Sequence, residues 1–142
     1  MKATITAALA LMLVVSPIHA NDKHAPLPAS VIAARTVYID NQTGHPEITD
    51  RAYEALSKWG RFKILKDAKD ADLVLRFTAD TKGRPTPPHN DIDVSPTPVL
   101  FSVFDQANNL LWSESKNKPF HSQTRLDIDE FKKRIEEQEK GN

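Results

Sequence analysis

The side chains best suited to binding a metal ion stand together in one short stretch, His89-Asn90-Asp91-Ile92-Asp93. Carboxylate and amide oxygens at alternating positions are what Ca²⁺ accepts as ligands. A calcium loop of the EF-hand kind would continue with a glycine and a distant glutamate, and neither stands at the required spacing. We therefore interpret the stretch as a solvated polar loop and keep metal binding as the alternative.

The other residues that could bind metals or catalyse are scattered along the chain. The histidines outside the first twenty residues are His24, His45, His89 and His121. None is spaced from another as a metal-binding pair would be, and cysteine is absent. An activated serine usually stands in a strained Gly-x-Ser-x-Gly turn, and the sequence has no such motif. Asp40 follows an expected strand without a partner base, so we expect it to accept hydrogen bonds in a turn. The sequence thus predicts no catalytic residue, no metal site and no cofactor.

The first residues have the pattern of a secretory signal peptide. Met1 and Lys2 make a basic start, Ile5 to Val15 form an uncharged and mostly apolar run, and Ala20 is a small residue at the expected cleavage site. The apolar run is shorter than the about 20 residues that a transmembrane helix needs. Asn21 stands where a bacterial lipoprotein has its lipid-bearing cysteine. We expect residues 1–20 to be removed and the mature chain to be periplasmic or secreted, without a transmembrane segment or a lipid anchor.

Charge argues against a nucleic-acid partner. The chain has 19 basic and 19 acidic residues, which cancel. Binding a phosphate backbone needs clustered lysines and arginines, whereas Lys132-Lys133-Arg134 stands between Glu130 and Glu136. We interpret this cluster as a solvated helix face.

The apolar pattern predicts one α+β domain over residues 35–142. Strands are expected at 36–40, 62–65, 72–78, 99–104 and 110–115, where β-branched, aromatic or alternating apolar residues gather. The last two should form a hairpin, and Asp67 to Ala71 a turn or a single helical turn. The element order is β-α-β-β-β-β-α, with one sheet packed by two helices.

Two amphipathic helices are expected. The first begins near Pro46 and ends at Gly60, residues suited to those positions, and its apolar stripe is Ile48, Ala52, Leu56 and Trp59. The second begins with Thr124 or Asp127 as N-cap, and its stripe is Leu126, Ile128, Phe131 and Ile135. Trp59 and Trp112 are interpreted as core residues rather than as surfaces on which a ligand stacks.

Two segments lack a regular pattern. Residues 21–34 contain Pro26 and Pro28 and few large apolar groups, so we expect an extended leader. Residues 80–97 are rich in proline, which opposes helices and central strands. A gap of this length is either functional or disordered. If it is functional, it contacts a partner through Pro85, Pro87, Pro88, His89, Asp91 and Asp93.

The order of these short patterns resembles small exported bacterial domains. They are Thr36-Val37-Tyr38-Ile39, the helix end Trp59-Gly60-Arg61-Phe62, Ala71-Asp72-Leu73-Val74-Leu75, Val103-Phe104-Asp105 and Leu111-Trp112-Ser113. This arrangement, from Thr36 to about Ile135, is similar to envelope accessory domains of the curli-secretion, penicillin-binding-protein-activator and Tol N-terminal types. The resemblance implies a non-catalytic module that presents a surface to envelope partners, and it transfers no functional residue.

The function expected from the sequence is therefore that of an exported, non-catalytic binding or accessory module of the bacterial cell envelope, with an envelope protein as its candidate partner. A small periplasmic hydrolase and a ligand-binding or metal-binding protein are the alternatives.

Export is testable by mass. The basic start, the apolar run and Ala20 predict that protein recovered from the envelope fraction begins at Asn21. Intact-mass spectrometry of that fraction checks this. A cytoplasmic product that still begins at Met1 or Ala3 would contradict the signal-peptide interpretation.

Overall fold

The computed structural model describes residues 25–79, 98–115 and 120–141. The predicted signal peptide and the loop of residues 80–97 lie outside the described residues, and so do the candidate contacts Pro85, Pro87, Pro88, His89, Asp91 and Asp93. The described helices are α1 (Ala29–Ala33), α2 (Pro46–Trp59), the 3-10 helix η1 (Ala68–Asp70) and α3 (Phe120–Gly141). The strands are β1 (Thr36–Asn41), β2 (Lys63–Leu65), β3 (Leu73–Ala79), β4 (Val99–Phe104) and β5 (Leu110–Ser115). Within these ranges no helix combines the length and the apolar character needed to span a membrane.

The strands form one mixed sheet in the order β2-β1-β3-β4-β5. β1 runs parallel to β2 and β3, whereas β4 runs antiparallel to β3 and β5. A parallel pair needs a crossover connection rather than a tight turn, and α2 provides it between β1 and β2. The predicted α+β fold is confirmed, and its main elements follow the expected β-α-β-β-β-β-α order.

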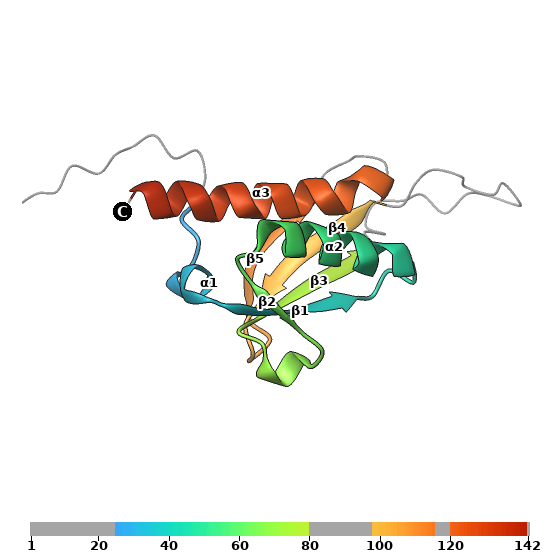
Figure 1. Cartoon of the computed structure of the whole chain (residues 1–142), viewed down its shortest axis with the longest axis horizontal. Helices are drawn as coiled ribbons and strands as arrows, with labels where there is room; N and C mark the ends of the chain where they lie inside the picture. The colour runs from blue at the N-terminus through green and yellow to red at the C-terminus, as the bar shows by residue number, and fades with distance from the viewer. Residues whose placement is uncertain (1–24, 80–97, 116–119, 142) are drawn as a thin grey trace, which may run out of the picture.

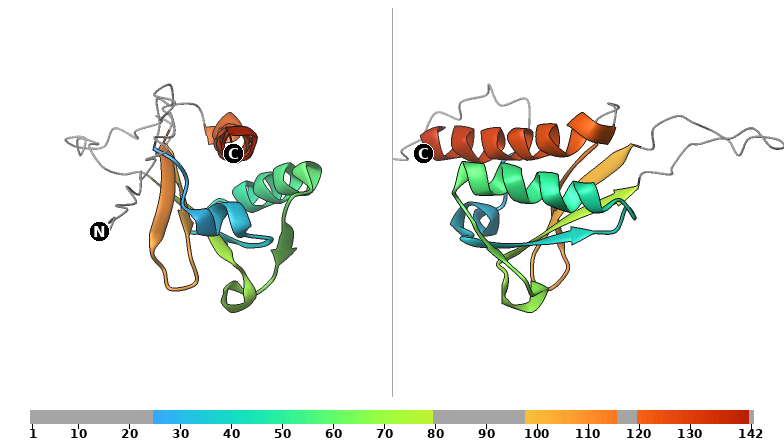
Figure 2. Two further views of the ribbon diagram at one scale, coloured as in Figure 1. Left: turned by 90° about the vertical axis from the view of Figure 1, so that its left-hand side faces the viewer. Right: turned by 45° about the vertical axis from the view of Figure 1, so that its right-hand side comes forward.

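Helices α2 and α3 lie side by side on one face of the sheet (Figures 1 and 2). Because side chains alternate along a strand, each strand turns every second residue toward these helices. The sheet contributes Val37, Leu73, Leu75, Phe77, Phe101 and Val103 to the core, and the helices contribute Ile48, Ala52, Leu56, Ile128, Phe131 and Ile135. Trp59 and Trp112 pack against this core, as predicted, and both are only partly buried.

The ends of α2 follow local rules that the sequence predicted. Pro46 occupies the first turn, where its missing N–H is not needed. Gly60 ends the helix in the left-handed region, with φ at 72°, and its N–H donates to the Leu56 carbonyl at 3.0 Å. Residues with a Cβ rarely adopt that conformation.

The prediction of an extended leader over residues 21–34 is wrong for the described residues from 25 onward. After Pro28 the chain forms α1, and Leu27, Val31 and Ala34 are buried in the domain core. The Leu27 N–H donates to Gln138 Oε1 at 2.7 Å, and Gln138 Nε2 donates to the Leu27 carbonyl at 3.0 Å. Three apolar side chains at helical spacing, docked on the C-terminal half of α3, therefore outweigh the prolines that favoured an extended chain.

The second predicted helix begins earlier than expected. α3 starts at Phe120, and neither Thr124 nor Asp127 is its N-cap. Gln123 is fully buried. Its Oε1 accepts from the Val99 N–H at 3.1 Å, and its Nε2 donates to the Val99 carbonyl. The backbone of β4 thus satisfies both polar groups of Gln123 inside the core.

The buried stripe of α2 predicts the cost of truncation. Leu56→Ala should lower the free energy of unfolding by about 2 to 5 kcal/mol, because the Leu56 side chain is 0% exposed. Leu110→Ala is the matched control, since Leu110 is 58% exposed, and it should change the free energy by no more than about 0.5 kcal/mol. Urea denaturation measures both. Equal losses in the two variants would show that Leu56 is not a core residue.

Candidate functional site

A groove with a volume of about 710 Å³ lies between α2 and α3 and is lined by residues of these two helices. Both helices run in the same direction in Figure 1, so residues early in one helix lie beside residues early in the other. We call this hollow the α2–α3 groove. Its apolar lining consists of Ala55, Trp59, Leu126 and Ile128. Its charged rim consists of Arg51, Glu54, Lys58, Arg125, Asp129 and Lys132.

The charged rim repeats one order of charge on both helices. On α2 a carboxylate, Glu54, stands between Arg51 and Lys58. On α3 Asp129 stands between Arg125 and Lys132 in the same way. Cations seven residues apart on a helix are separated by about 10.5 Å along its axis. The rim therefore has a pair of cations near each end and two carboxylates between them.

Two of the rim cations, Arg125 and Lys132, form long ion pairs. Arg125 Nε lies 3.8 Å from Asp129 Oδ2, and Lys132 Nζ lies 3.8 Å from Glu136 Oε1. The side chains of Arg125 and Asp129 are 78% and 56% exposed. Exposed pairs of this kind contribute about 0 to 1 kcal/mol. These cations can therefore turn toward a bound anionic group at little cost.

The apolar lining continues into the domain core. Trp59 packs edge-on against Phe62 and Phe131, with ring centroids 5.1 and 6.2 Å apart. Ile128 is 1% exposed, whereas Trp59 and Ala55 are only partly buried. The walls of the groove are thus two helices held on one packed core, and their spacing is set before any ligand arrives.

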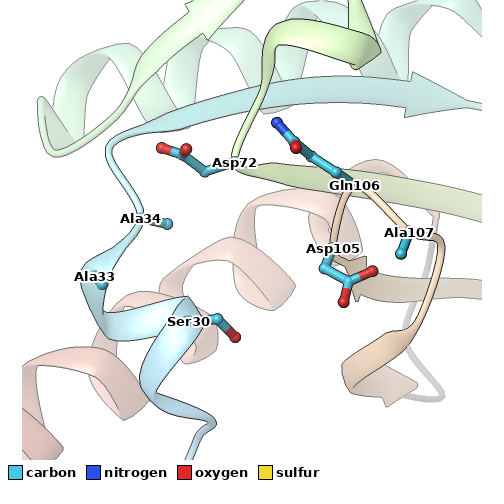
Figure 3. A pocket seen from close by; sticks show the side chains of 7 residues that line it. All are labelled: Ser30, Ala33, Ala34, Asp72, Asp105, Gln106 and Ala107. Atoms are coloured by element: carbon cyan, nitrogen blue, oxygen red, sulfur yellow. The ribbon is translucent and has the colours of Figure 1, made fainter.

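A second, shallower hollow of about 390 Å³ lies between α1, the residue before β3 and the β4–β5 turn (Figure 3). Its carboxylates are engaged in local structure. Asp72 Oδ2 accepts from the backbone N–H groups of Arg35 and Thr36 at 2.8 and 2.9 Å, and these bonds hold the pKa of Asp72 below its ordinary value. Asp105 accepts from the side-chain amide and the backbone N–H of Asn109, both at 2.8 Å, and these bonds lower its pKa. Both groups are ionised at neutral pH, which does not suit a general acid.

The face of the sheet opposite α2 and α3 has a different character. The strand register places Leu65, Tyr38, Val74, Phe104 and Leu110 in one row across all five strands. Beside this row, Arg76 Nε donates to Asp40 Oδ2 at 2.6 Å, and the Arg76 guanidinium lies 4.4 Å from the Phe104 ring centroid.

Asp40 accepts hydrogen bonds, as the sequence predicted. Besides the bond from Arg76, Gln42 Nε2 donates to Asp40 Oδ2 at 2.9 Å. Asp40 therefore joins the end of β1 to β3 and is a structural residue.

The histidines that the structure describes, His45 and His121, lie at the starts of two different helices. His45 stands at the N-cap of α2, where its Nδ1 lies 3.5 Å from Glu47 Oε1, and His121 lies in the first turn of α3. His24 and His89 lie outside the described residues. Across residues 25–79, 98–115 and 120–141, no group of three His, Cys, Asp or Glu residues could hold a metal ion.

Sequence reasoning missed the α2–α3 groove. Its only signal is that Arg51 and Lys58, and likewise Arg125 and Lys132, stand seven residues apart on a helix beside an intervening carboxylate. That pattern is ordinary for a solvated helix surface. Only the packing of α2 beside α3 turns the two patterns into one rim.

Comparison with known proteins identifies no family for this chain. No family model matches it, and no curated protein matches it. Among solved structures, the dodecamer of a PelC variant from Paraburkholderia phytofirmans is 16% identical, with a TM-score of 0.43, over 78% of this chain and 92% of that one. A minor lipoprotein from Acinetobacter baumannii is 16% identical, with a TM-score of 0.33, over 74% of this chain and 90% of that one. Function is therefore inferred from the residues of this chain.

The carboxylate of Asp72 makes stability depend on pH. A pKa that is lower in the folded state than in the unfolded state adds stability above the unfolded value, about 3.9 for an aspartate, and this stability is lost as the pH falls through the folded value. Asp72→Asn should therefore lower Tm at pH 7, and the difference from the wild type should shrink below about pH 4. The control is Asp70→Asn, because Asp70 is an exposed aspartate in η1. A Tm difference for Asp72→Asn that is the same at pH 7 and pH 3 would contradict this account.

Proposed function

We propose that this protein is an exported, non-catalytic binding module of the bacterial cell envelope and that it holds an envelope protein in the α2–α3 groove. The observation that carries this proposal is the groove itself, in which a partly exposed apolar lining meets a rim with four cations and two carboxylates. Clefts that combine apolar area with a few placed polar groups are the usual binding sites of proteins.

The chemistry of the groove supports binding rather than catalysis. Among the described residues that line it there is no histidine, serine, threonine or cysteine, and nucleophilic catalysis needs such a group beside a base. Its two carboxylates stand on different helices between cations. A small hydrolase remains the alternative function, and it has no comparable site in the described part of the chain.

Export to the envelope is the second part of the proposal. It is supported by the basic start, the apolar run and the small residue at position 20, and by the resemblance of the short apolar patterns to envelope accessory domains. The proposed module therefore meets its partner outside the cytoplasm.

Site-specific photocrosslinking tests the proposal in cells. A benzoylphenylalanine at Glu54 faces the groove, and one at Tyr53, which is 56% exposed, stands about 100° away around the same helix. A third at Ser113 reports on the opposite face of the sheet. We expect the Glu54 variant to capture one envelope protein and the other two variants not to capture it.

The alternatives give different results. Capture from Ser113 alone would move the binding surface to the opposite sheet face. No capture from any position, together with turnover of a substrate in a hydrolase panel, would favour the enzyme.

A further inference from the structure

We infer that the α2–α3 groove takes an acidic amphipathic α-helix of the partner protein, with carboxylates about two helical turns apart. This inference rests on the proposed function and names the kind of segment that the groove binds. It is carried by the order of charge on the rim, by the apolar lining and by the geometry of the two walls.

The excess of cations on the rim indicates that the bound segment is negatively charged. Arg51 and Arg125 stand toward the N-terminal end of the groove, and Lys58 and Lys132 stand seven residues further along the same helices. Among the residues that line the groove, Glu54 and Asp129 carry the opposite charge, and Glu136 lies 3.8 Å from Lys132 just outside it. A helix with Asp or Glu at positions i and i+7 spans the same distance of about 10.5 Å and meets a cation from both walls at each end. A basic residue midway between them would face the two rim carboxylates.

The backbone N–H and C=O groups of the bound segment must form their hydrogen bonds within the segment. The walls of the groove are two α-helices whose main-chain groups are bonded within the helices, so they offer no strand edge to a ligand. An extended peptide in this hollow would leave buried N–H and C=O groups without partners, which is costly. A helix satisfies its own backbone and presents only side chains, and helices commonly bind in grooves in this way.

The apolar lining of the groove contacts the apolar side chains of the bound helix. Trp59 provides a partly exposed aromatic surface, and Ala55, beside it, is small enough to leave room for an inserted side chain. Apolar residues at i, i+3 or i+4 of the bound helix match this lining. The ligand is therefore amphipathic and not merely acidic.

A continuous anionic membrane surface fits the rim less well. It would meet Glu54 and Asp129 together with the four cations, so repulsion would offset part of the attraction. The apolar lining is also recessed between two helices rather than projecting from them, whereas membrane-surface helices insert a projecting apolar face.

The test removes the rim cations and keeps the fold. The groove variant carries Arg51→Gln, Lys58→Gln, Arg125→Gln and Lys132→Gln. The control carries Lys63→Gln, Lys66→Gln, Lys133→Gln and Lys140→Gln, which removes the same charge from exposed positions away from the groove. Circular dichroism and Tm establish that both variants fold. Both are made in the full chain with benzoylphenylalanine at Glu54, and the crosslinked partner segment is mapped by mass spectrometry.

We expect the mapped segment to be helical, with carboxylates seven residues apart and an apolar stripe. Crosslink yield should fall about tenfold in the groove variant, because complementary charges govern both encounter and orientation, and it should stay near the wild-type yield in the control. The mapped segment, synthesised as a labelled peptide, should bind the purified protein more weakly as salt is raised.

Four results would overturn the inference. The first is a mapped segment that is basic or extended, and the second is an equal crosslink yield from the two variants. The third is self-crosslinking that shows a second copy of the chain in the groove. The fourth is groove-dependent binding to phosphatidylglycerol vesicles in place of a protein. Capture from Glu54 that survives in the groove variant would leave the proposed function standing and refute only the acidic helix. Absence of any capture from Glu54 in the otherwise wild-type chain would refute both.

Discussion

The arrangement of this domain depends on the ring of Phe131. Its centroid lies 6.2 Å from Trp59, 6.4 Å from Phe62, 5.9 Å from Phe101 and 5.3 Å from Trp112. These partners come from α2, from the residues after it, from β4 and from β5. One buried side chain of α3 therefore contacts both the neighbouring helix and the sheet. Aromatic pairs at such distances add about 0.5 to 1.5 kcal/mol each beyond the area that they bury. This cluster fixes the distance between α2 and α3, and with it the width of the groove.

Polar contacts then hold α3 along its length. Near its start, Gln123 is bonded to the Val99 backbone. Near its end, Gln138 is bonded to Leu27, and Arg61 Nη1 donates to Glu139 Oε1 at 2.8 Å. Arg61 Nη2 also donates to the Ile32 carbonyl at 2.8 Å, which ties the C-terminal half of α3 to α1. A surface whose walls are fixed in this manner loses little conformational entropy when it binds, and such preorganisation favours affinity.

The sequence predicted those features that local rules decide. The stripe of α2, its ends at Pro46 and Gly60, and the strands that form the sheet all follow from periodicity and turn chemistry, and they were predicted within a residue or two. The misses share one physical cause, which is that each depends on a contact with a distant segment. Helix α1 is stabilised by α3 more than 90 residues away in sequence, and the early start of α3 is accompanied by the bonds of Gln123 to the Val99 backbone. The groove is likewise made from two segments, each of which alone has the pattern of a solvated helix face.

Overall neutrality of charge conceals how the charges are used. Asp40, Asp72 and Asp105 are engaged by Arg76, by backbone N–H groups and by Asn109, and they stabilise the ends of strands and a turn. Such carboxylates cannot be redirected to a ligand without loss of structure. The rim of the groove differs, since the ion pairs that Arg125 and Lys132 form are 3.8 Å long and join exposed side chains. The chain has equal numbers of acidic and basic residues, yet the α2–α3 groove has a local excess of positive charge beside its apolar lining. Binding a ligand there breaks few of the contacts that stabilise the fold.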